Sequence, residues 1–258
     1  MSTLSYAARD SATMLRRNLL HALRYPSMVV STAGMPIVFL LLFVYVFGST
    51  LGAGIGGSHY VDYVVPGILL MTTASGSIST AVSVCMDMTE GIVARFRTMA
   101  ISRASLLTGH VVGSLILTVL SLVVVLGVAL LMGFRSGAGP AEWAAVAGLL
   151  VLLTLALTWL AVAFGLVADR PETASNLPLP LALLPFIGSG FVPTRSMPVG
   201  VRQFAEYQPF TPITETLRGL LTGTPIGHSG VIAVAWCAGI GLAGYLWSRS
   251  LFGRKTGR

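Results

Sequence analysis

The chain has 258 residues, of which 54% are hydrophobic and only 10% are Asp, Glu, Lys or Arg, and its mean hydropathy is +0.83. Soluble proteins carry about 25% charged residues, so this composition excludes an ordinary soluble domain. The net charge of +7 does not indicate a nucleic-acid partner, because the basic residues border apolar stretches and form no separate basic domain. We therefore expect a membrane protein that binds no nucleic acid.

Six long stretches of the sequence contain no Asp, Glu, Lys or Arg. A helix needs roughly 20 predominantly apolar residues to cross the bilayer, and each stretch is long enough. Unbroken runs of this kind form helices, since in hydrocarbon only helices and closed barrels satisfy every backbone polar group. The sequence predicts an all-α integral membrane protein with six transmembrane helices, at residues 28–48, 64–85, 107–132, 143–167, 174–192 and 229–248.

Basic residues are divided unequally between the two sides that these six helices would create. With the N-terminus in the cytoplasm, all but four of the 16 Lys and Arg residues would lie on the cytoplasmic side. Cytoplasmic connections of membrane proteins carry an excess of Lys and Arg. We therefore expect both termini to be cytoplasmic, with a tail at 249–258. The four basic residues on the outer side would be Arg135, Arg195, Arg202 and Arg218.

Residues 1–27, which precede the first apolar stretch, have the pattern of an amphipathic helix. Leu and Ala recur every three or four positions from Leu4 to Ala22, which places them on one side of a helix. A helix lying in the membrane interface, held by apolar burial and by anionic lipid, is one interpretation, and a solvated tail is the other. In the first interpretation, four basic residues would contact the lipid interface: Arg9, Arg16, Arg17 and Arg24.

The second predicted span carries a run of small and hydroxylated residues. Such residues let transmembrane helices approach closely and form hydrogen bonds inside a bundle. Tight packing is one interpretation of this run, and a polar wall of a translocation path is the other. In both cases the helix does not mainly face lipid. The candidate lining residues are Thr72, Thr73, Ser75, Ser77, Ser79 and Thr80.

The connection between the second and third spans, residues 87–103, mixes charged side chains with Phe96, Met99 and Ile101. It is too polar to cross the bilayer. A short helix with both charged and apolar anchors suits docking on a partner protein. The alternative is a solvated turn at the interface, whose arginines only set the topology.

Residues 193–226 are expected outside, because five spans from a cytoplasmic start end there. Prolines cut this segment into pieces too short to span, yet it is rich in apolar and aromatic side chains. This combination suggests short re-entrant or interfacial helices buried against the bundle. Glu215 and Arg218 could form an ion pair on one helix, or they could have a functional role at this depth. The candidate residues are Tyr207, Phe210, Glu215 and Arg218.

The residues that several kinds of catalytic or energy-coupling site require are missing. The only lysine is Lys255, which excludes a GxxxxGK phosphate loop. Cys85 and Cys237 both fall in predicted spans and offer no disulfide or metal framework. The predicted spans have no acidic residue or histidine near their middle, which argues against a proton- or sodium-driven carrier. We expect no catalytic residue and no metal site, and Ser189, between two glycines, is the one candidate for an intramembrane nucleophile.

Several motifs follow one another in a fixed order after the basic N-terminal segment. They are Glu90-Gly91, Arg95-Phe-Arg-Thr-Met-Ala-Ile-Ser-Arg103, Leu107-Thr-Gly-His110, Gly188-Ser-Gly-Phe-Val-Pro193, Gln208-Pro-Phe-Thr-Pro212 and Glu215-Thr-Leu-Arg218-Gly219. In this order they resemble the transmembrane permease subunits of ABC-2 type transporters, particularly the antibiotic, daunorubicin-resistance-like exporter branch. The resemblance covers nearly the whole chain.

This resemblance implies a single transmembrane domain over residues 1–258 in the bacterial cell membrane, which exports amphipathic small molecules or lipid-linked compounds. A separate P-loop ATPase in two copies would hold the ATP and Mg, and this chain would bind no cofactor. A second permease chain, identical or related, would complete the pathway. Residues 1–27 would be an elbow helix and 193–226 an outer re-entrant hairpin. The coupling helix that docks on the ATPase would contain Glu90, Gly91, Arg95, Phe96, Arg97, Thr98, Met99, Ser102 and Arg103.

Other functions remain open at this point. A glycan or lipid exporter of the same architecture is the nearest alternative. An ion-coupled secondary transporter and an intramembrane enzyme that uses Ser189 are alternatives from different classes.

Overall fold

The computed structural model describes residues 26–52, 60–89 and 103–256, and every regular element in these ranges is a helix, which confirms the all-α class. The elements are α2 (Pro26–Leu41), the π-helix η1 (Leu42–Val46), α3 (Gly48–Gly52), α4 (Tyr60–Thr89), α6 (Arg103–Leu131), α7 (Pro140–Val167), α8 (Pro171–Asn176), α9 (Leu179–Ile187), the 3-10 helix η3 (Thr194–Ser196), α10 (Val199–Tyr207), α11 (Phe210–Thr222) and α12 (Ser229–Thr256).

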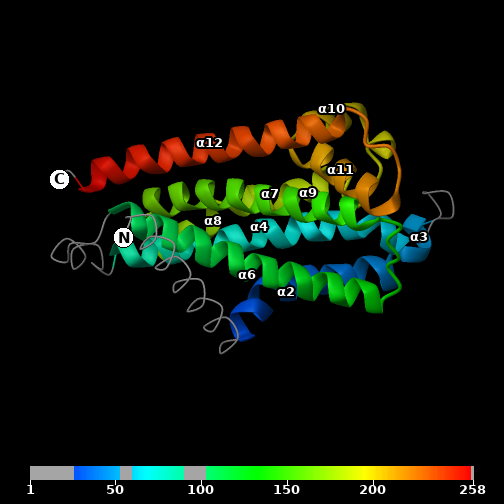
Figure 1. The fold of residues 1–258 in the computed structure, drawn as a ribbon, viewed down its shortest axis with the longest axis horizontal. Helices are drawn as coiled ribbons and strands as arrows, with labels where there is room; N and C mark the ends of the chain where they lie inside the picture. Colours follow the sequence, from blue (N-terminus) through cyan, green and yellow to red (C-terminus); the bar gives the residue numbers. More distant parts are fainter. Residues whose placement is uncertain (1–25, 53–59, 90–102, 257–258) are drawn as a thin grey trace, which may run out of the picture.

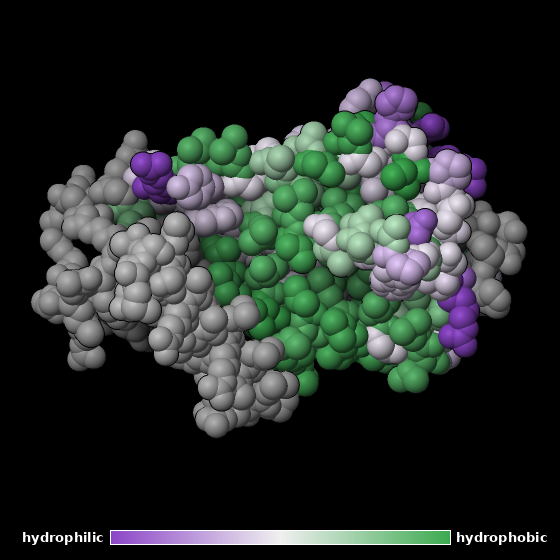
Figure 2. Space-filling view, viewed as in Figure 1, coloured by the Kyte–Doolittle hydropathy of each residue, from purple (hydrophilic) through white to green (hydrophobic). Residues whose placement is uncertain are grey.

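Five helices within the described residues are long and apolar enough to cross a membrane. They lie side by side as a bundle (Figure 1), and Figure 2 shows hydrophobic residues gathered over its middle with hydrophilic ones toward its ends. This distribution fits a layer of hydrocarbon bounded by water on both sides. The five candidate spans coincide with five of the six predicted ones and cover Val29–Val46, Tyr60–Thr89, Gly109–Leu131, Pro140–Val167 and Ser229–Phe252.

The segment predicted as a fifth span, residues 174–192, is not one helix. It consists of the end of α8, a turn, α9 and a non-helical stretch from Gly188 onward. Pro178 lies at the break, and because it has no amide hydrogen it cannot continue the helical hydrogen bonds of α8. The described part of the chain therefore has five long spanning helices and not six.

The two short helices nevertheless follow α4 along most of its length. Ala174 of α8 forms a small apolar cluster with Cys85 near the end of α4. Gly190, after α9, lies against Gly67 near the start of α4, where a Cβ on Gly67 would come within 2.7 Å of the Gly190 carbonyl oxygen. Residues 67 and 85 are 18 positions apart in one helix, which corresponds to about 27 Å. The segment 174–190 therefore runs antiparallel to α4 over about the thickness of a bilayer core.

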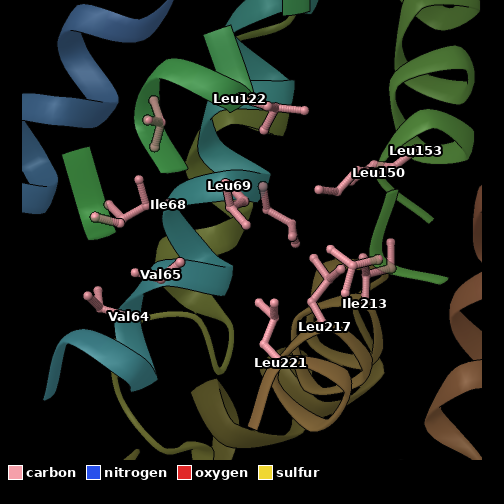
Figure 3. Close-up of a cluster of buried hydrophobic side chains, with 14 of the residues drawn as sticks. Val64, Val65, Ile68, Leu69, Leu122, Leu150, Leu153, Ile213, Leu217 and Leu221 are labelled. Carbon is pink, nitrogen blue, oxygen red and sulfur yellow. The ribbon is translucent and has the colours of Figure 1, made fainter. Parts of the chain in front are cut away.

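α4 is the central helix of the bundle and packs on α2, α6, α7, α8, α9 and α11. In its most apolar window 72% of the residues are buried inside the chain, against 17% for α12 at one edge of the bundle. Figure 3 shows the largest apolar cluster, where the side chains of α4, α6, α7 and α11 meet. The labelled members are Val64, Val65, Ile68, Leu69, Leu122, Leu150, Leu153, Ile213, Leu217 and Leu221.

α12 packs mainly against α7, and a glycine allows the close approach. A Cβ on Gly244 would lie 2.6 Å from the backbone nitrogen of Leu160, whereas a Cβ on Gly239, in the same helix, would meet no atom within 4 Å. Small residues at such contacts bring two helix backbones together, which is how helices associate where lipid removes the hydrophobic driving force.

We expect Gly244→Ala to destabilise the protein by about 1–3 kcal/mol, because the methyl group would push the α12 backbone away from α7. The matched control is Gly239→Ala, which gains the same helix propensity of about 1 kcal/mol without a clash. Thermal unfolding of the purified protein in mild detergent measures both. Equal melting temperatures for the two variants would contradict the close approach of α7 and α12.

Candidate functional site

Most residues expected to dock a partner or hold the membrane interface lie outside the described residues, so their roles remain predictions. Arg103 is the exception, and it begins α6. The others are Glu90, Gly91, Arg95, Phe96, Arg97, Thr98, Met99 and Ser102 of the expected coupling helix, and Arg9, Arg16, Arg17 and Arg24 of the expected elbow.

α4 and α6 are joined near the two ends that flank residues 90–102. The His110 Nε2 atom lies 2.8 Å from the Asp87 carboxylate, and the two side chains are 15% and 27% exposed. Partial burial keeps much of the water away from the pair and strengthens the contact. The Asp87–His110 pair therefore helps to fix the spacing between the end of α4 and the beginning of α6.

Several hydroxyl groups on α4 are buried inside the bundle and bonded to the backbone of their own helix. Thr72 Oγ1 donates to the Ile68 carbonyl (2.8 Å) and Thr73 Oγ1 donates to the Leu69 carbonyl (3.0 Å). Ser77 follows the same pattern. These bonds satisfy the hydroxyls without a ligand, which supports the packing interpretation for these positions.

The other three candidates on α4 differ in exposure or in their contacts with other helices, although Ser75 and Thr80 also donate to carbonyl oxygens of their own helix. Thr80 Oγ1 lies 2.6 Å from Ser114 Oγ of α6, which in turn lies 3.4 Å from Thr158 Oγ1 of α7. This row of hydroxyls links three helices across the core. Ser75 is half-buried and Ser79 is exposed, so the α4 surface that a second molecule could reach is the one that carries these two serines.

A mostly buried guanidinium joins α11, α4 and the turn after α9. Arg218 Nη2 donates to the Ser189 carbonyl (2.6 Å) and to the Tyr63 carbonyl (3.2 Å), and Arg218 Cζ lies 3.7 Å from the centre of the Tyr63 ring. We call Tyr63, Ser189 and Arg218 the Arg218 clamp. Hydrogen bonds from a charged donor contribute about 1.5–3 kcal/mol, and the ring face adds a cation–π attraction.

Burial lowers the pKa of the Arg218 guanidinium, an effect that Tyr63 and Glu215 oppose. Arginine remains charged at neutral pH even when it is buried. The clamp therefore places a fixed positive charge between three elements, held by neutral acceptors.

The predicted ion pair between Glu215 and Arg218 is wrong. Glu215 is exposed, and its carboxylate accepts a hydrogen bond from Ser229 Oγ (3.3 Å). Within the described residues, the ion pairs join Asp87 to His110 and Arg202 to Glu206. Arg218 instead reaches toward α4, where carbonyl oxygens and an aromatic ring stabilise the guanidinium.

Two polar side chains fasten the beginning of α11: Gln208 contacts α9, and Thr211 Oγ1 accepts a hydrogen bond from the Ser189 amide (3.4 Å) in the turn after α9. Gln208 Nε2 donates to the Leu184 carbonyl (3.3 Å) and to Thr211 Oγ1 (3.1 Å), and Gln208 Oε1 accepts from the Phe210 amide (3.1 Å). Phe210 is buried in the core, whereas Tyr207, before the turn, is 81% exposed. The segment expected to be re-entrant thus contains the 3-10 helix η3 and two short α-helices, α10 and α11, of which α11 is largely enclosed by α4, α7 and α12.

Ser189 lacks the surroundings of a nucleophile. Its Oγ is buried and has no hydrogen-bond partner among the described residues. A nucleophilic serine needs a base within hydrogen-bond reach, and the part of the chain that the structure describes places none there. The same part contains no group of three or more His, Cys, Asp or Glu side chains that could hold a metal ion.

The tyrosines at the beginning of α4 are functional candidates that the sequence analysis missed. Tyr60 Oη donates to the Phe191 carbonyl (3.0 Å), and the rings of Tyr60 and Tyr63 stack with centroids 6.3 Å apart. Tyrosine three residues from tyrosine at the end of a span is a signal of a membrane interface. The sequence does not indicate which carbonyl oxygens these side chains meet.

Comparison with known proteins identifies the chain. The ABC-2 type transporter family matches residues 10–222, which is most of its length. The chain belongs to the ABC-2 type transporter family. It is a transmembrane permease subunit, and ATP is hydrolysed by a separate ATPase subunit. This confirms the family that the sequence motifs resemble.

Two relatives of this ABC-2 permease match it over most of both chains. It is 26% identical to the daunorubicin resistance ABC transporter permease protein DrrB1 of Streptomyces coeruleorubidus, over 84% of this chain and 77% of the relative. It is also 26% identical to a probable doxorubicin resistance ABC transporter permease protein, DrrC of Mycobacterium tuberculosis, over 82% of this chain and 76% of the relative.

A double-mutant cycle in the permease tests the Asp87–His110 pair. We expect Asp87→Asn and His110→Gln each to lower the unfolding free energy, and the double variant to lose about 1–2 kcal/mol less than the sum, because the two side chains contact each other. The matched control is the cycle of Arg202→Gln and Glu206→Gln, an exposed pair with a coupling of at most about 0.5 kcal/mol. Strict additivity at positions 87 and 110 would show that the pair contributes nothing.

Proposed function

We propose that this ABC-2 permease exports amphipathic small molecules of the drug or antibiotic kind, driven by a P-loop ATPase on a separate polypeptide. The observation that carries the proposal is the match with two drug-resistance permeases over more than 80% of this chain. The sequence supports the division of labour, because its only lysine, Lys255, does not occur in a phosphate-binding loop. A glycan or lipid exporter of the same architecture is the alternative.

The proposed pathway forms where two permease chains, identical or related, face each other. Ser75 and Ser79 lie on the side of α4 that the chain's own helices leave partly or fully open. Hydroxyls among apolar side chains offer an amphipathic molecule both hydrogen bonds and apolar contact. The buried hydroxyls of the same helix would then support the wall rather than line it.

The proposed topology has six crossings, of which one is broken. α8 and α9 together follow α4 across the bundle, and the break between them lies at Pro178, which is buried, whereas Leu179 beside it is exposed. An interrupted helix is tolerated in a membrane where protein or a water-filled cavity covers its backbone, and a second permease chain would supply cover on the exposed side. Both termini would be cytoplasmic and α10 and α11 would lie at the outer surface, in agreement with the excess of basic residues at the other end. α11 would be the buried part of the outer re-entrant hairpin.

Energy would enter through residues 90–102, which connect α4 to α6. In this proposal the segment docks on the ATPase, two copies of which bind ATP and Mg, and the Asp87–His110 pair ties the helices on either side of it. ATP-driven closure of the ATPase would then displace the cytoplasmic end of α4. A ligand shifts such an equilibrium only through different contacts in the two states, and the docked segment would supply them.

Charge reversal in the docking segment tests this proposal. We expect Arg95→Glu combined with Arg97→Glu to reduce co-purification of the ATPase at least about tenfold, because two attractive contacts would become repulsive. The matched control combines Arg195→Glu with Arg202→Glu, at the opposite end of the bundle, and should leave co-purification unchanged.

Quantitative mass spectrometry of the affinity-purified permease gives the ratio of the two polypeptides. An undiminished ATPase signal after reversal of Arg95 and Arg97 would count against docking through this segment. No ATPase with the unaltered permease, in a detergent that preserves other membrane complexes, would count against the exporter function itself.

A further inference from the structure

We propose that the Arg218 clamp is the latch that holds the α11 end of the permease closed, and that the ATP-bound partner opens the pathway by releasing it. The inference rests on the proposed function, because it needs an ATP-driven cycle. It assigns to Arg218 a positioning role: the residue holds the turn at Ser189 against α4 without contacting the transported molecule.

The acceptors of the guanidinium are suited to a contact that must break and reform. Arg218 binds the carbonyl oxygens of Tyr63 and Ser189 and the ring of Tyr63. A carboxylate would hold the charge far more strongly, and none lies at ion-pair distance among the described residues, since Glu215 contacts Ser229 instead. Neutral acceptors hold the closed state, yet water can replace them when the turn moves away.

The backbone at the clamp can move at two places. Pro66, three residues after Tyr63 in α4, lacks an amide hydrogen and interrupts the hydrogen bonds of the first turns of the helix. Gly188 and Gly190 flank Ser189, and Gly190 meets Gly67 backbone to backbone. At Gly67 and Gly190 the two segments therefore contact each other through the backbone, without side chains that interlock at that point.

The closed arrangement also leaves one buried polar group unsatisfied. Ser189 is 3% exposed, and its hydroxyl has no hydrogen-bond partner among the described residues. A buried hydroxyl without a partner disfavours the state that contains it. Opening would expose Ser189 to water, so the hydroxyl opposes the closed state while Arg218 favours it. The two opposing contributions bring the free energies of the closed and open states closer together, as a contact that opens and closes requires.

An aromatic cluster connects the latch to the first span. The Phe191 ring stacks on Phe186 of α9 and lies beside Phe43 of η1, each at 4.6 Å between centroids, and Tyr60 of α4 binds the Phe191 carbonyl. Movement of the turn at Ser189 would therefore also shift the π-helix η1. Such irregular turns inside a spanning helix often occur at functional sites.

Chemical accessibility of position 189 tests the latch in the complete complex. Cys85→Ala and Cys237→Ala remove both native thiols, and Ser189→Cys then places a single thiol beneath the clamp. The probe is a membrane-impermeant maleimide applied from the α11 side, to permease and ATPase together in membranes. The rate of labelling is measured without nucleotide and with the ATPase trapped by ATP and vanadate.

We expect the trapped state to be labelled at least about tenfold faster than the nucleotide-free state, and Arg218→Gln to raise the nucleotide-free rate to that of the trapped state. Arg202→Gln, an exposed arginine on the neighbouring helix α10, is the matched control and should change neither rate. In the same cysteine-free background, Tyr207→Cys should be labelled in every state and Leu157→Cys in none.

Equal labelling of position 189 with and without trapped ATP would overturn the latch, provided that the ATPase still co-purifies. That comparison uses the unaltered Arg218, so it decides the matter even if the Arg218→Gln protein does not assemble. An Arg218→Gln complex that folds, as shown by a protected Leu157→Cys, but keeps position 189 protected would overturn it as well. Failure of the ATPase to associate with the unaltered permease would contradict the proposed function instead.

Discussion

The enclosure of α4 by its neighbours is the constraint on which the rest of the structure depends. Lipid removes most of the hydrophobic advantage of helix contact, so close packing, small residues and hydrogen bonds must hold the bundle together. α4 supplies all three: an apolar face in the main core, glycines at positions 67 and 76, and the Thr80 hydroxyl, which contacts Ser114 of α6. The other helices are arranged around it, and α12, which does not contact it closely, is the least buried span.

The two ends of α4 are held by different chemistry, and this difference suits a transporter that works by shifting between two states. Near Thr89 an acid–histidine pair ties α4 to α6 beside the segment proposed to dock on the ATPase. Near Tyr60 a guanidinium, two tyrosines and backbone carbonyls tie it to the turn after α9 and to α11. The apolar core between them is close-packed and transmits displacement rather than absorbing it. In the proposed cycle, displacement at one end of α4 would thus reach the contacts at the other.

The sequence predicts the features of this fold that depend on local composition. It does not predict the features that depend on which distant residue of the chain a side chain contacts. Uninterrupted apolar stretches predict five long helices, because hydrocarbon leaves the backbone no alternative. The same reasoning gave one helix at 174–192, where the chain breaks at Pro178 into two shorter helices. The pairing of Arg218 with Glu215 was inferred from spacing alone, but tertiary contacts with α4 decide where the guanidinium lies. The Asp87–His110 contact joins two helices and has no local signal.

Transport in everted membrane vesicles tests the central claim of this account, that a separate ATPase drives export through this chain. Vesicles from cells that produce both polypeptides would be incubated with a fluorescent amphipathic drug, either with ATP in the presence of a protonophore or with a proton gradient in the absence of ATP. The account predicts accumulation that requires ATP and both polypeptides, and that persists when the protonophore abolishes the gradient. Accumulation driven by the proton gradient without ATP, or by this chain alone, would contradict it.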